Sequence, residues 1–374
     1  MIKLIISFLA LFCIAFSCSE QTEKTDVTEF SKQIVESIDS IISNEIETKN
    51  LPGVVVGVWI PGEGEYVKAF GTANLETGKK RKLTDQFRIA SITKTFAGLR
   101  ILQLHDADSL NIDDSLSKYF PDFPRGNSIK IRNLLNMNSG ISDFAGHEFL
   151  EEWYDDPMMP FTMEEAVAMS AKDSAEFYTP GDSVKYCNVN YTILGLIIEK
   201  IMGNPVGEEI ENHIMQPLGM ENSLYPYETA LPGELRGYSW NNTTNEFEDK
   251  TELNPVVANT GGAIISNLYD LKRYVKALYT GELISKETHE KQIITIPMQG
   301  TPEWIQYGLG IINMGSFYGH NGTIFGFSTE IYYLPEKDAV IVINVNRLDV
   351  DDQSKSGPLF FKIAKLLFPD YVKW

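Results

Sequence analysis

Cysteine is scarce in this sequence, with three residues in a chain of 374. Cys13 lies inside an apolar N-terminal segment and Cys18 follows directly after it, so Cys187 is the one cysteine in the body of the chain. A single cysteine excludes an internal disulfide framework. Two interpretations of Cys187 stay open, a nucleophile or a small buried residue that fills the core, and we expect the second.

Basic residues and metal-binding patterns are also sparse. The 32 lysines and arginines are outnumbered by 51 acidic residues, and the net charge is -19. Such a surface repels phosphates, which argues against nucleic acid as a partner. The five histidines form no His-x-His or His-Glu-x-x-His pattern, and neither a P-loop nor a dinucleotide-binding glycine pattern occurs. We therefore expect no metal ion and no cofactor.

Long apolar runs are absent except at the start of the chain. Residues 4–16 are almost continuously apolar, follow Lys3, and fall short of the ~20 residues that a membrane span needs. A positive start, a short apolar stretch and a small residue at the end predict an export signal over residues 1–17. The sequence around Cys18 resembles a lipobox, although an ordinary signal-peptidase site also fits. We expect an exported, lipid-anchored protein of the cell envelope, with residues 18–28 as a tether.

The order of the predicted elements indicates an α+β fold. Strand patterns occur near both ends of the chain, and helical patterns dominate the middle. The expected strands are 54–60, 66–70, 307–313, 316–320, 327–334 and 339–345, and the clearest helices are 26–48, 91–105, 189–202 and 358–368. Strands from both ends would form one central antiparallel sheet flanked by the N- and C-terminal helices. We expect residues 29–110 and 258–374 to form this α/β unit, and residues 111–257 to form an inserted helical domain.

A serine and a lysine at the start of a predicted helix suggest nucleophilic chemistry. Ser91 and Lys94 in Ser-Ile-Thr-Lys would lie on one helix face, about 5–6 Å apart at Cβ. Backbone N–H groups at a helix N-terminus suit a serine whose attack creates a negative oxygen. The alternative is an N-cap serine followed by a solvated lysine. A second copy of the pattern, Ser115 to Lys118, lies in a short segment and is interpreted as chance.

Two further motifs favour the nucleophile. Tyr186-Cys187-Asn188 is the one Tyr-x-Asn in the chain, and His320-Asn321-Gly322 is the one His-x-Gly. In this order the three motifs resemble those of the serine β-lactamase and penicillin-binding protein superfamily, most closely its class C branch with related DD-peptidases and esterases. The resemblance covers roughly residues 30–370 and extends to Tyr307-Gly308-Leu309-Gly310 and to residues 260–266.

The third motif departs from the common Lys-Thr-Gly of the superfamily. A literal Lys355-Ser356-Gly357 follows the last predicted strand, where it cannot line a site, so Lys355 is interpreted as solvated. The resemblance therefore assigns the position of the Lys-Thr-Gly lysine to His320. His-x-Gly is weaker evidence for antibiotic hydrolysis than Lys-Thr-Gly is.

The resemblance implies an acyl-enzyme mechanism. The hydroxyl of Ser91 would attack a carbonyl, and either Lys94 or Tyr186 would accept its proton. Because the two groups would titrate together, the sequence does not assign the base. His320 completes the expected catalytic set.

The resemblance also implies substrate contacts. We expect Asn188 to hold Lys94 and the substrate amide, and the backbone N–H groups of Ser91 and Thr323 to form the oxyanion hole. The expected substrate-binding residues are Asn188, Gly322, Thr323 and Asn346. Asn346 would lie near a substrate carboxylate, and Arg347 would either bind that carboxylate or be exposed.

The expected function is therefore a serine hydrolase of the cell envelope. A D-alanyl-D-alanine carboxypeptidase-like peptidase or an esterase is favoured over a class C-like β-lactamase. The alternative is a protein without catalytic activity, a homologue that binds peptidoglycan. The expected partner is a small-molecule or peptide substrate, and the membrane is contacted through Cys18 alone.

Overall fold

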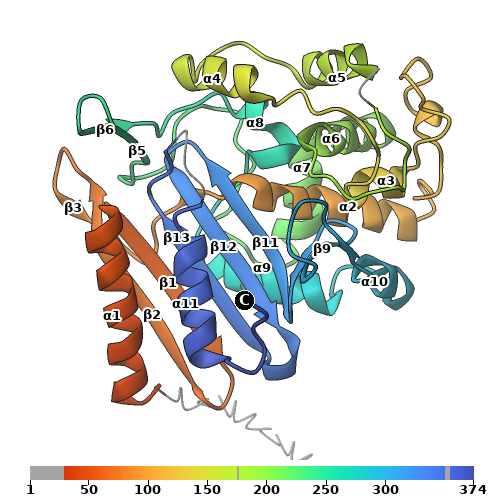
Figure 1. Cartoon of the computed structure of the whole chain (residues 1–374). Helices are drawn as coiled ribbons and strands as arrows, with labels where there is room; N and C mark the ends of the chain where they lie inside the picture. The colour runs from red at the N-terminus through yellow and green to blue at the C-terminus, as the bar shows by residue number, and fades with distance from the viewer. Residues whose placement is uncertain (1–28, 175–176, 350–353) are drawn as a thin grey trace, which may run out of the picture.

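A computed structural model describes residues 29–174, 177–349 and 354–374 of the chain (Figure 1). The predicted signal and tether, including Cys18, lie outside the described residues. Within the described ranges, no helix is both long and apolar enough to cross a bilayer.

Strands from the two ends of the chain form one antiparallel sheet of nine strands, as predicted. Its order is β3-β2-β1-β13-β12-β11-β10-β9-β8. The first and last long strands lie side by side, with Val54 opposite Val345 and Trp59 opposite Val340. The strands are β1 (Gly53–Ile60), β2 (Gly64–Asn74), β3 (Lys79–Lys80), β8 (Ile296–Pro297), β9 (Ile305–Tyr307), β10 (Ile312–Met314), β11 (Phe317–Ile324), β12 (Phe327–Leu334) and β13 (Ala339–Val345).

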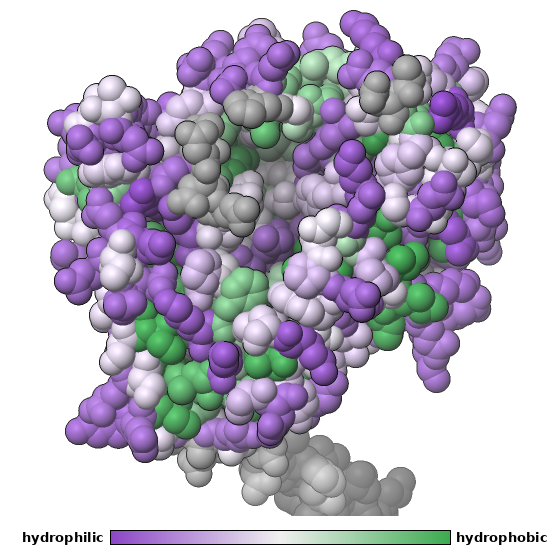
Figure 2. Space-filling view, viewed as in Figure 1, coloured by the Kyte–Doolittle hydropathy of each residue, from purple (hydrophilic) through white to green (hydrophobic). Residues whose placement is uncertain are grey.

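Helices cover both faces of this sheet (Figure 1). The terminal helices α1 (Lys32–Lys49) and α11 (Gly357–Leu367) pack together on one face, and α9 (Leu268–Thr280) covers the other. Every residue of β1, β12 and β13 is therefore buried, which explains their nearly continuous apolar sequences. Figure 2 shows the α1 and α11 side as mostly hydrophilic with small hydrophobic groups, as expected where amphipathic helices lie on a sheet.

The remaining helices lie beside the sheet. Their bounds are α2 (Thr93–Asp106), α3 (Ile131–Leu135), α4 (His147–Asp155), α5 (Met163–Lys172), α6 (Asn188–Met202), α7 (Val206–Ile210), α8 (Pro255–Gly262) and α10 (Lys286–Gln292). Helix α2 contacts α6 and α8, and nearly all of its side chains are buried. It is preceded by a short 3-10 turn over Ala90–Ile92.

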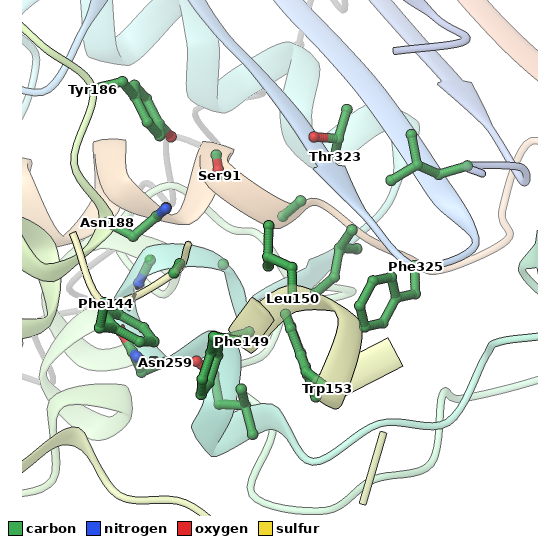
Figure 3. A pocket seen from close by; sticks show the side chains of 18 of the residues that line it. Ser91, Phe144, Phe149, Leu150, Trp153, Tyr186, Asn188, Asn259, Thr323 and Phe325 are labelled. Carbon is green, nitrogen blue, oxygen red and sulfur yellow. Dashed lines mark hydrogen bonds between the residues drawn. The ribbon is translucent and has the colours of Figure 1, made fainter. Parts of the chain in front are cut away.

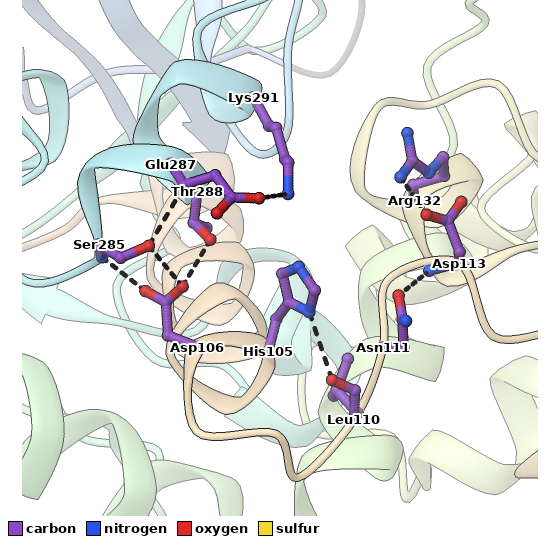
Figure 4. A network of polar contacts seen from close by, with 10 residues as sticks. All are labelled: His105, Asp106, Leu110, Asn111, Asp113, Arg132, Ser285, Glu287, Thr288 and Lys291. Carbon is purple, nitrogen blue, oxygen red and sulfur yellow. Dashed lines mark hydrogen bonds and ion pairs between the residues drawn. The ribbon is translucent and has the colours of Figure 1, made fainter.

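The far end of α2 is anchored by a polar network (Figure 4). The carboxylate of Asp106 accepts hydrogen bonds from the Ser285 amide at 2.6 Å, the Ser285 hydroxyl at 2.8 Å and the Thr288 hydroxyl at 2.5 Å. Ser285 also caps α10. The C-terminal end of the helix that follows Ser91 is therefore fixed to the start of α10.

Three sequence predictions of local structure are wrong. Helix α1 begins at Lys32 with Ser31 as its cap, because the Ser31 hydroxyl accepts from the Ile34 amide at 3.4 Å. The expected strand 307–313 is two strands, since the chain turns between β9 and β10. Residues 225–250 carry no strand or helix period, so the sequence also predicts a loop there, but this segment contains a hairpin of β5 (Tyr238–Asn241) and β6 (Glu246–Asp249).

Candidate active site

A cavity of about 310 Å³ lies where the start of α2, the end of β11, α4 and α8 meet. Ser91, Tyr186 and Thr323 lie along one side, and apolar side chains of α4 and its surroundings face them (Figure 3). Ser91 is partly exposed to the cavity, whereas the lysine one turn later is fully enclosed.

Lys94 contacts the Ser91 hydroxyl directly. Its Nζ donates to Ser91 Oγ at 3.0 Å and to the Gly261 carbonyl at 2.6 Å. Burial lowers the pKa of Lys94 to about 7, although the negative charge of Asp143 opposes this shift. Helix α2 has no side-chain cap, so the N-cap interpretation of Ser91 is not supported.

The backbone immediately before Ser91 is strained. Ala90 has φ +50°, a region that residues other than glycine seldom adopt. Its side chain is buried against surrounding structure, which holds this conformation. Such strain persists only where packing over-determines it, and it is concentrated at functional sites.

Tyr186 points its hydroxyl at the same serine. Its oxygen is directed toward Ser91 in Figure 3, and the Lys94 Nζ lies 5.0 Å from the centroid of its ring. Burial raises the pKa of Tyr186 well above its usual value, and Tyr307 adds to this effect. Of the two candidate bases, Lys94 is therefore the one whose unprotonated, basic form is populated near neutral pH, whereas Tyr186 remains a protonated phenol.

Asn188 lines the cavity, but its amide has a different partner from the one expected. The Asn188 Nδ2 donates to Asp143 Oδ2 at 2.8 Å. The same carboxylate accepts from the backbone N–H of Asn188 at 2.9 Å and from the backbone N–H of Val189 at 3.1 Å. Asp143 therefore caps the N-terminus of α6. The expected support of Lys94 comes instead from Ser91 and Gly261. No sequence pattern pointed to Asp143.

A kink in α8 presents the carbonyl that holds Lys94. Asn259 has φ +38° and ψ -145° inside this helix. Its Oδ1 accepts from the Gly261 amide at 3.0 Å and from the Thr192 hydroxyl at 3.0 Å. Asn259 thus orients Gly261, although the sequence marked only the neighbouring residues 260–266.

His320 lies beside Tyr186 and not against the cavity. It is fully buried within β11, its ring centroid is 6.4 Å from that of Tyr186, and its Nε2 is 3.1 Å from the Tyr307 hydroxyl. Its Nδ1 lies 2.5 Å from the Asn321 carbonyl, which can only accept, so Nε2 accepts from Tyr307. Burial lowers the pKa of His320 to about 3, so its imidazole is neutral. His320 was expected to complete the catalytic set; it lies beside Tyr186 and Tyr307 and is not among the residues that line the cavity.

Gly322 and Thr323 place β11 against the strained turn. A side chain at position 322 would bring its Cβ to 2.1 Å from the Ile89 carbonyl oxygen and 3.0 Å from the Ser91 amide nitrogen. Position 322 therefore requires glycine because of this close approach. Thr323 follows it, is exposed and lines the cavity next to Ser91.

Asn346 does not line the cavity. It is fully buried, and its Nδ2 donates to the Thr72 carbonyl at 3.2 Å and to the Arg236 carbonyl at 2.9 Å. The prediction of a contact between Asn346 and a substrate carboxylate is therefore wrong. Its amide joins three segments of backbone.

The cations near Asn346 are also turned away from substrate. Arg347 was expected either to bind a substrate carboxylate or to be exposed, but it is buried and engaged within the protein. Its Nε and Nη2 donate to Asp349 at 3.0 and 2.6 Å. Its Nη1 donates to the Lys49 and Asn50 carbonyls at 2.6 and 3.0 Å. Lys355 is buried with its Nζ 3.1 Å from Asp349, so the prediction that it is solvated is wrong.

Cys187 is buried, as the space-filling interpretation predicts. Its Sγ contacts the Ile141 carbonyl at 3.5 Å. Burial raises the pKa of this thiol well above its usual value, so it is not a thiolate. Among the described residues, no group of three or more His, Cys, Asp or Glu side chains could hold a metal ion.

The fold and this site together define a serine hydrolase with a serine–lysine pair at a helix start. The chain belongs to the beta-lactamase family, whose family model matches residues 38–359. This assigns it to the serine β-lactamase and penicillin-binding protein superfamily, as the motifs predicted. It is a member of a family of serine hydrolases.

Two curated relatives are similar over most of the chain. Penicillin-binding protein 4* of Bacillus subtilis is 27% identical over 307 residues, which are 78% of this chain and 67% of the relative. Protein flp of Staphylococcus aureus is 26% identical over 330 residues, which are 83% of this chain and 63% of the relative. The chain thus spans about two thirds of the length of these relatives.

Solved structures share the fold. A D-stereospecific amidohydrolase from Streptomyces sp. has a TM-score of 0.78 at 26% identity and covers 89% of this chain and 98% of its own. A D-amino acid amidase from Ochrobactrum anthropi has a TM-score of 0.79 at 23% identity, covering 90% and 99%, and supports the fold alone.

Proposed function

We propose that the protein hydrolyses small amides or esters through an acyl-enzyme on Ser91. One observation carries the proposal: Lys94 Nζ lies 3.0 Å from Ser91 Oγ and has a pKa lowered to about 7. A neutral amine at hydrogen-bond distance is what a serine hydroxyl needs to become a nucleophile.

The proposed reaction has two half-reactions. Ser91 Oγ bonds to the substrate carbonyl carbon as its proton passes to Lys94. The bond to the leaving group then breaks, and the leaving nitrogen or oxygen takes up that proton. Water next attacks the acyl-enzyme, releases a carboxylic acid and restores the Ser91 hydroxyl.

The surrounding groups would stabilise this path. Tyr186 stays protonated, so its hydroxyl can donate to Ser91 Oγ or to the leaving group. The amides of Ser91 and Thr323 would bind the oxyanion, with each donor lowering the barrier by about 3–4 kcal/mol. Asn188, held by Asp143, would contact the substrate amide.

The substrates expected from the sequence, a D-alanyl peptide or an ester, both fit this scheme. The 26% identity to a D-stereospecific amidohydrolase and the similarity to penicillin-binding proteins support an amide substrate. We further propose that the protein acts in the cell envelope after export, anchored by a lipid at Cys18. This proposal rests on the residue pattern of the first 18 positions.

The test of the proposed function is a comparison of two serines. Ser91→Ala should abolish labelling by a fluorophosphonate probe and turnover of a p-nitrophenyl ester. Ser115→Ala, in the second Ser-x-x-Lys copy, is the matched control and should leave both intact. Full labelling of folded Ser91→Ala protein would overturn the assignment of the nucleophile.

Mass spectrometry after incubation with a penicillin separates the alternatives. A lasting adduct indicates a penicillin-binding peptidase, and hydrolysed antibiotic indicates a β-lactamase. Ester or amide turnover without an adduct indicates an esterase or amidase. No reaction with any of these compounds would favour the catalytically silent homologue.

A further inference from the structure

We infer that this site takes amides or esters with a bulky apolar acyl side chain and a leaving group that carries no carboxylate. The inference deepens the proposed function and rests on it. It follows from what lines the cavity and from how the nearby cations are used.

The wall opposite Ser91 is apolar and largely aromatic. Helix α4 contributes Phe149, Leu150 and Trp153, and Phe144 and Phe325 close the sides (Figure 3). The ring centroids of Trp153 and Phe325 lie 4.7 Å apart, and those of Phe144 and Phe149 lie 5.1 Å apart. This packed wall offers an acyl group an apolar surface within a cavity of about 310 Å³, a size suited to a small ligand.

No lysine or arginine is among the described residues that line the cavity. Among the described residues that line it, Asp349 is the one with a charged side chain, and it is negative. Lys94 is near but fully buried beneath Ser91, where both of its hydrogen-bond partners are protein atoms. A carboxylate beside the scissile bond would therefore meet aromatic rings and an acidic side chain, and it would find no cation without a partner among the described lining residues.

The cations beyond the lining are already engaged. Arg347 forms a two-pronged ion pair with Asp349 and donates to two backbone carbonyls, and Lys355 pairs with the same Asp349. A substrate carboxylate could recruit Arg347 only by breaking these contacts. Transfer of a charge into an apolar cavity without a counter-ion is strongly unfavourable. The free C-terminus of a carboxypeptidase substrate is therefore disfavoured, whereas a capped amide or an ester is accepted.

The test uses substrates that differ in one group. Phenylalanyl-alanine and phenylalanyl-alaninamide, each as D,D and L,L forms, differ in the carboxylate alone, and kcat/KM is measured for both near neutral pH. We expect the capped member of the better enantiomer to be preferred by at least about tenfold. Phenylalanine amide should likewise be preferred over alanine amide by about tenfold or more. Equal or better use of the carboxylate substrate, or no turnover of any of these compounds by an enzyme active on p-nitrophenyl acetate, would overturn the inference.

Two variants trace the preferences to the structure. Asp349→Asn removes the like charge and releases Arg347, so the preference for the capped peptide should shrink by about threefold or more. Asp338→Asn breaks an ion pair with Lys276 at the far end of β12 and should leave that ratio unchanged. Because the measured quantity is the ratio of the kcat/KM values of two substrates on the same protein sample, a smaller folded fraction lowers both values equally and leaves the ratio unchanged. An unchanged ratio in Asp349→Asn would contradict the role given to Asp349.

The apolar wall has its own matched pair. Leu150 lines the cavity with 40% of its surface exposed, and Leu366 on α11 is 39% exposed away from it. Leu150→Ala should reduce the preference for phenylalanine amide over alanine amide by about threefold, whereas Leu366→Ala should not change it. Failure of the proposed function is recognised separately, because wild-type protein would then show no Ser91-dependent turnover of p-nitrophenyl acetate at all.

Discussion

The chain contains the Ser-x-x-Lys motif twice, at Ser91–Lys94 and at Ser115–Lys118, and the two lysines have opposite electrostatic environments. Lys94 is fully buried, donates to Ser91 and has a pKa lowered to about 7. Lys118 keeps 56% of its side chain exposed, pairs with Asp114 at 2.7 Å and has a raised pKa because of that pair. Ser115 bonds to Ser117 instead of to its lysine. The two motifs have the same spacing, so the difference in pKa comes from the surroundings: burial lowers the pKa of Lys94 far enough for it to act as a base.

The largest expected difference between the copies is in catalysis. Lys94→Met should lower kcat/KM for an ester substrate by about 10³-fold or more, because Lys94 is the described side chain that both bonds to Ser91 and has a populated basic form near neutral pH. Lys118→Met should change kcat/KM by less than about twofold, since Lys118 lies on the surface in solvent. A loss of only a few-fold in Lys94→Met would refute its role in activation.

The pH dependence sharpens the comparison further. Because Lys94 must be unprotonated, kcat/KM should fall as pH drops through about 7. The Asp143 carboxylate raises the pKa of Lys94, so Asp143→Asn should move this acid limb to lower pH while weakening the cap of α6. Asp114→Asn is the matched control, and its pH profile should coincide with that of the wild type. A profile of Asp143→Asn that moves to higher pH would contradict the electrostatic account.

The smallest expected difference is in stability, and its sign is unusual. The pKa of Lys94 is lower in the folded chain than in the unfolded chain, so between about pH 7 and the ordinary lysine value the unfolded state binds more protons. Folding is therefore penalised at low pH, and the penalty fades as pH rises through this window. Lys94→Met should stabilise the fold by roughly 1–3 kcal/mol at neutral pH, seen as a raised Tm. Lys118→Met should leave Tm nearly unchanged, and a lower Tm in Lys94→Met would contradict the cost assigned to burying the amine.

The parts of the site that local sequence could predict are those carried by short motifs. Ser91, Lys94 and Tyr186 were expected together and lie together, because each motif sits at the end of a regular element whose period is visible in the sequence. The central sheet was predicted from the apolar runs at both chain ends, which need no knowledge of distant contacts.

The remaining features depend on contacts between segments without periodicity. Asp143 and Asn259 act through hydrogen bonds to α6 and Gly261, and no local pattern marks either residue. Lys355 was expected in solvent because it follows the last predicted strand, but it is buried and pairs with Asp349. Asn346 was expected at the substrate, but its side chain is bonded to two other backbone segments, at Thr72 and Arg236. The division into an α/β unit and an inserted helical domain, and the lipid anchor at Cys18, stay predictions.

The most direct test of the central claim is the titration of Lys94 itself. Isotope-labelled lysine allows the Nζ chemical shift to be followed by NMR against pH, with the Lys94 signal assigned by its loss in Lys94→Met. We predict a transition near pH 7 for Lys94, well separated from the other lysines. A transition of Lys94 together with the exposed lysines, near their ordinary value of about 10.4, would contradict the account.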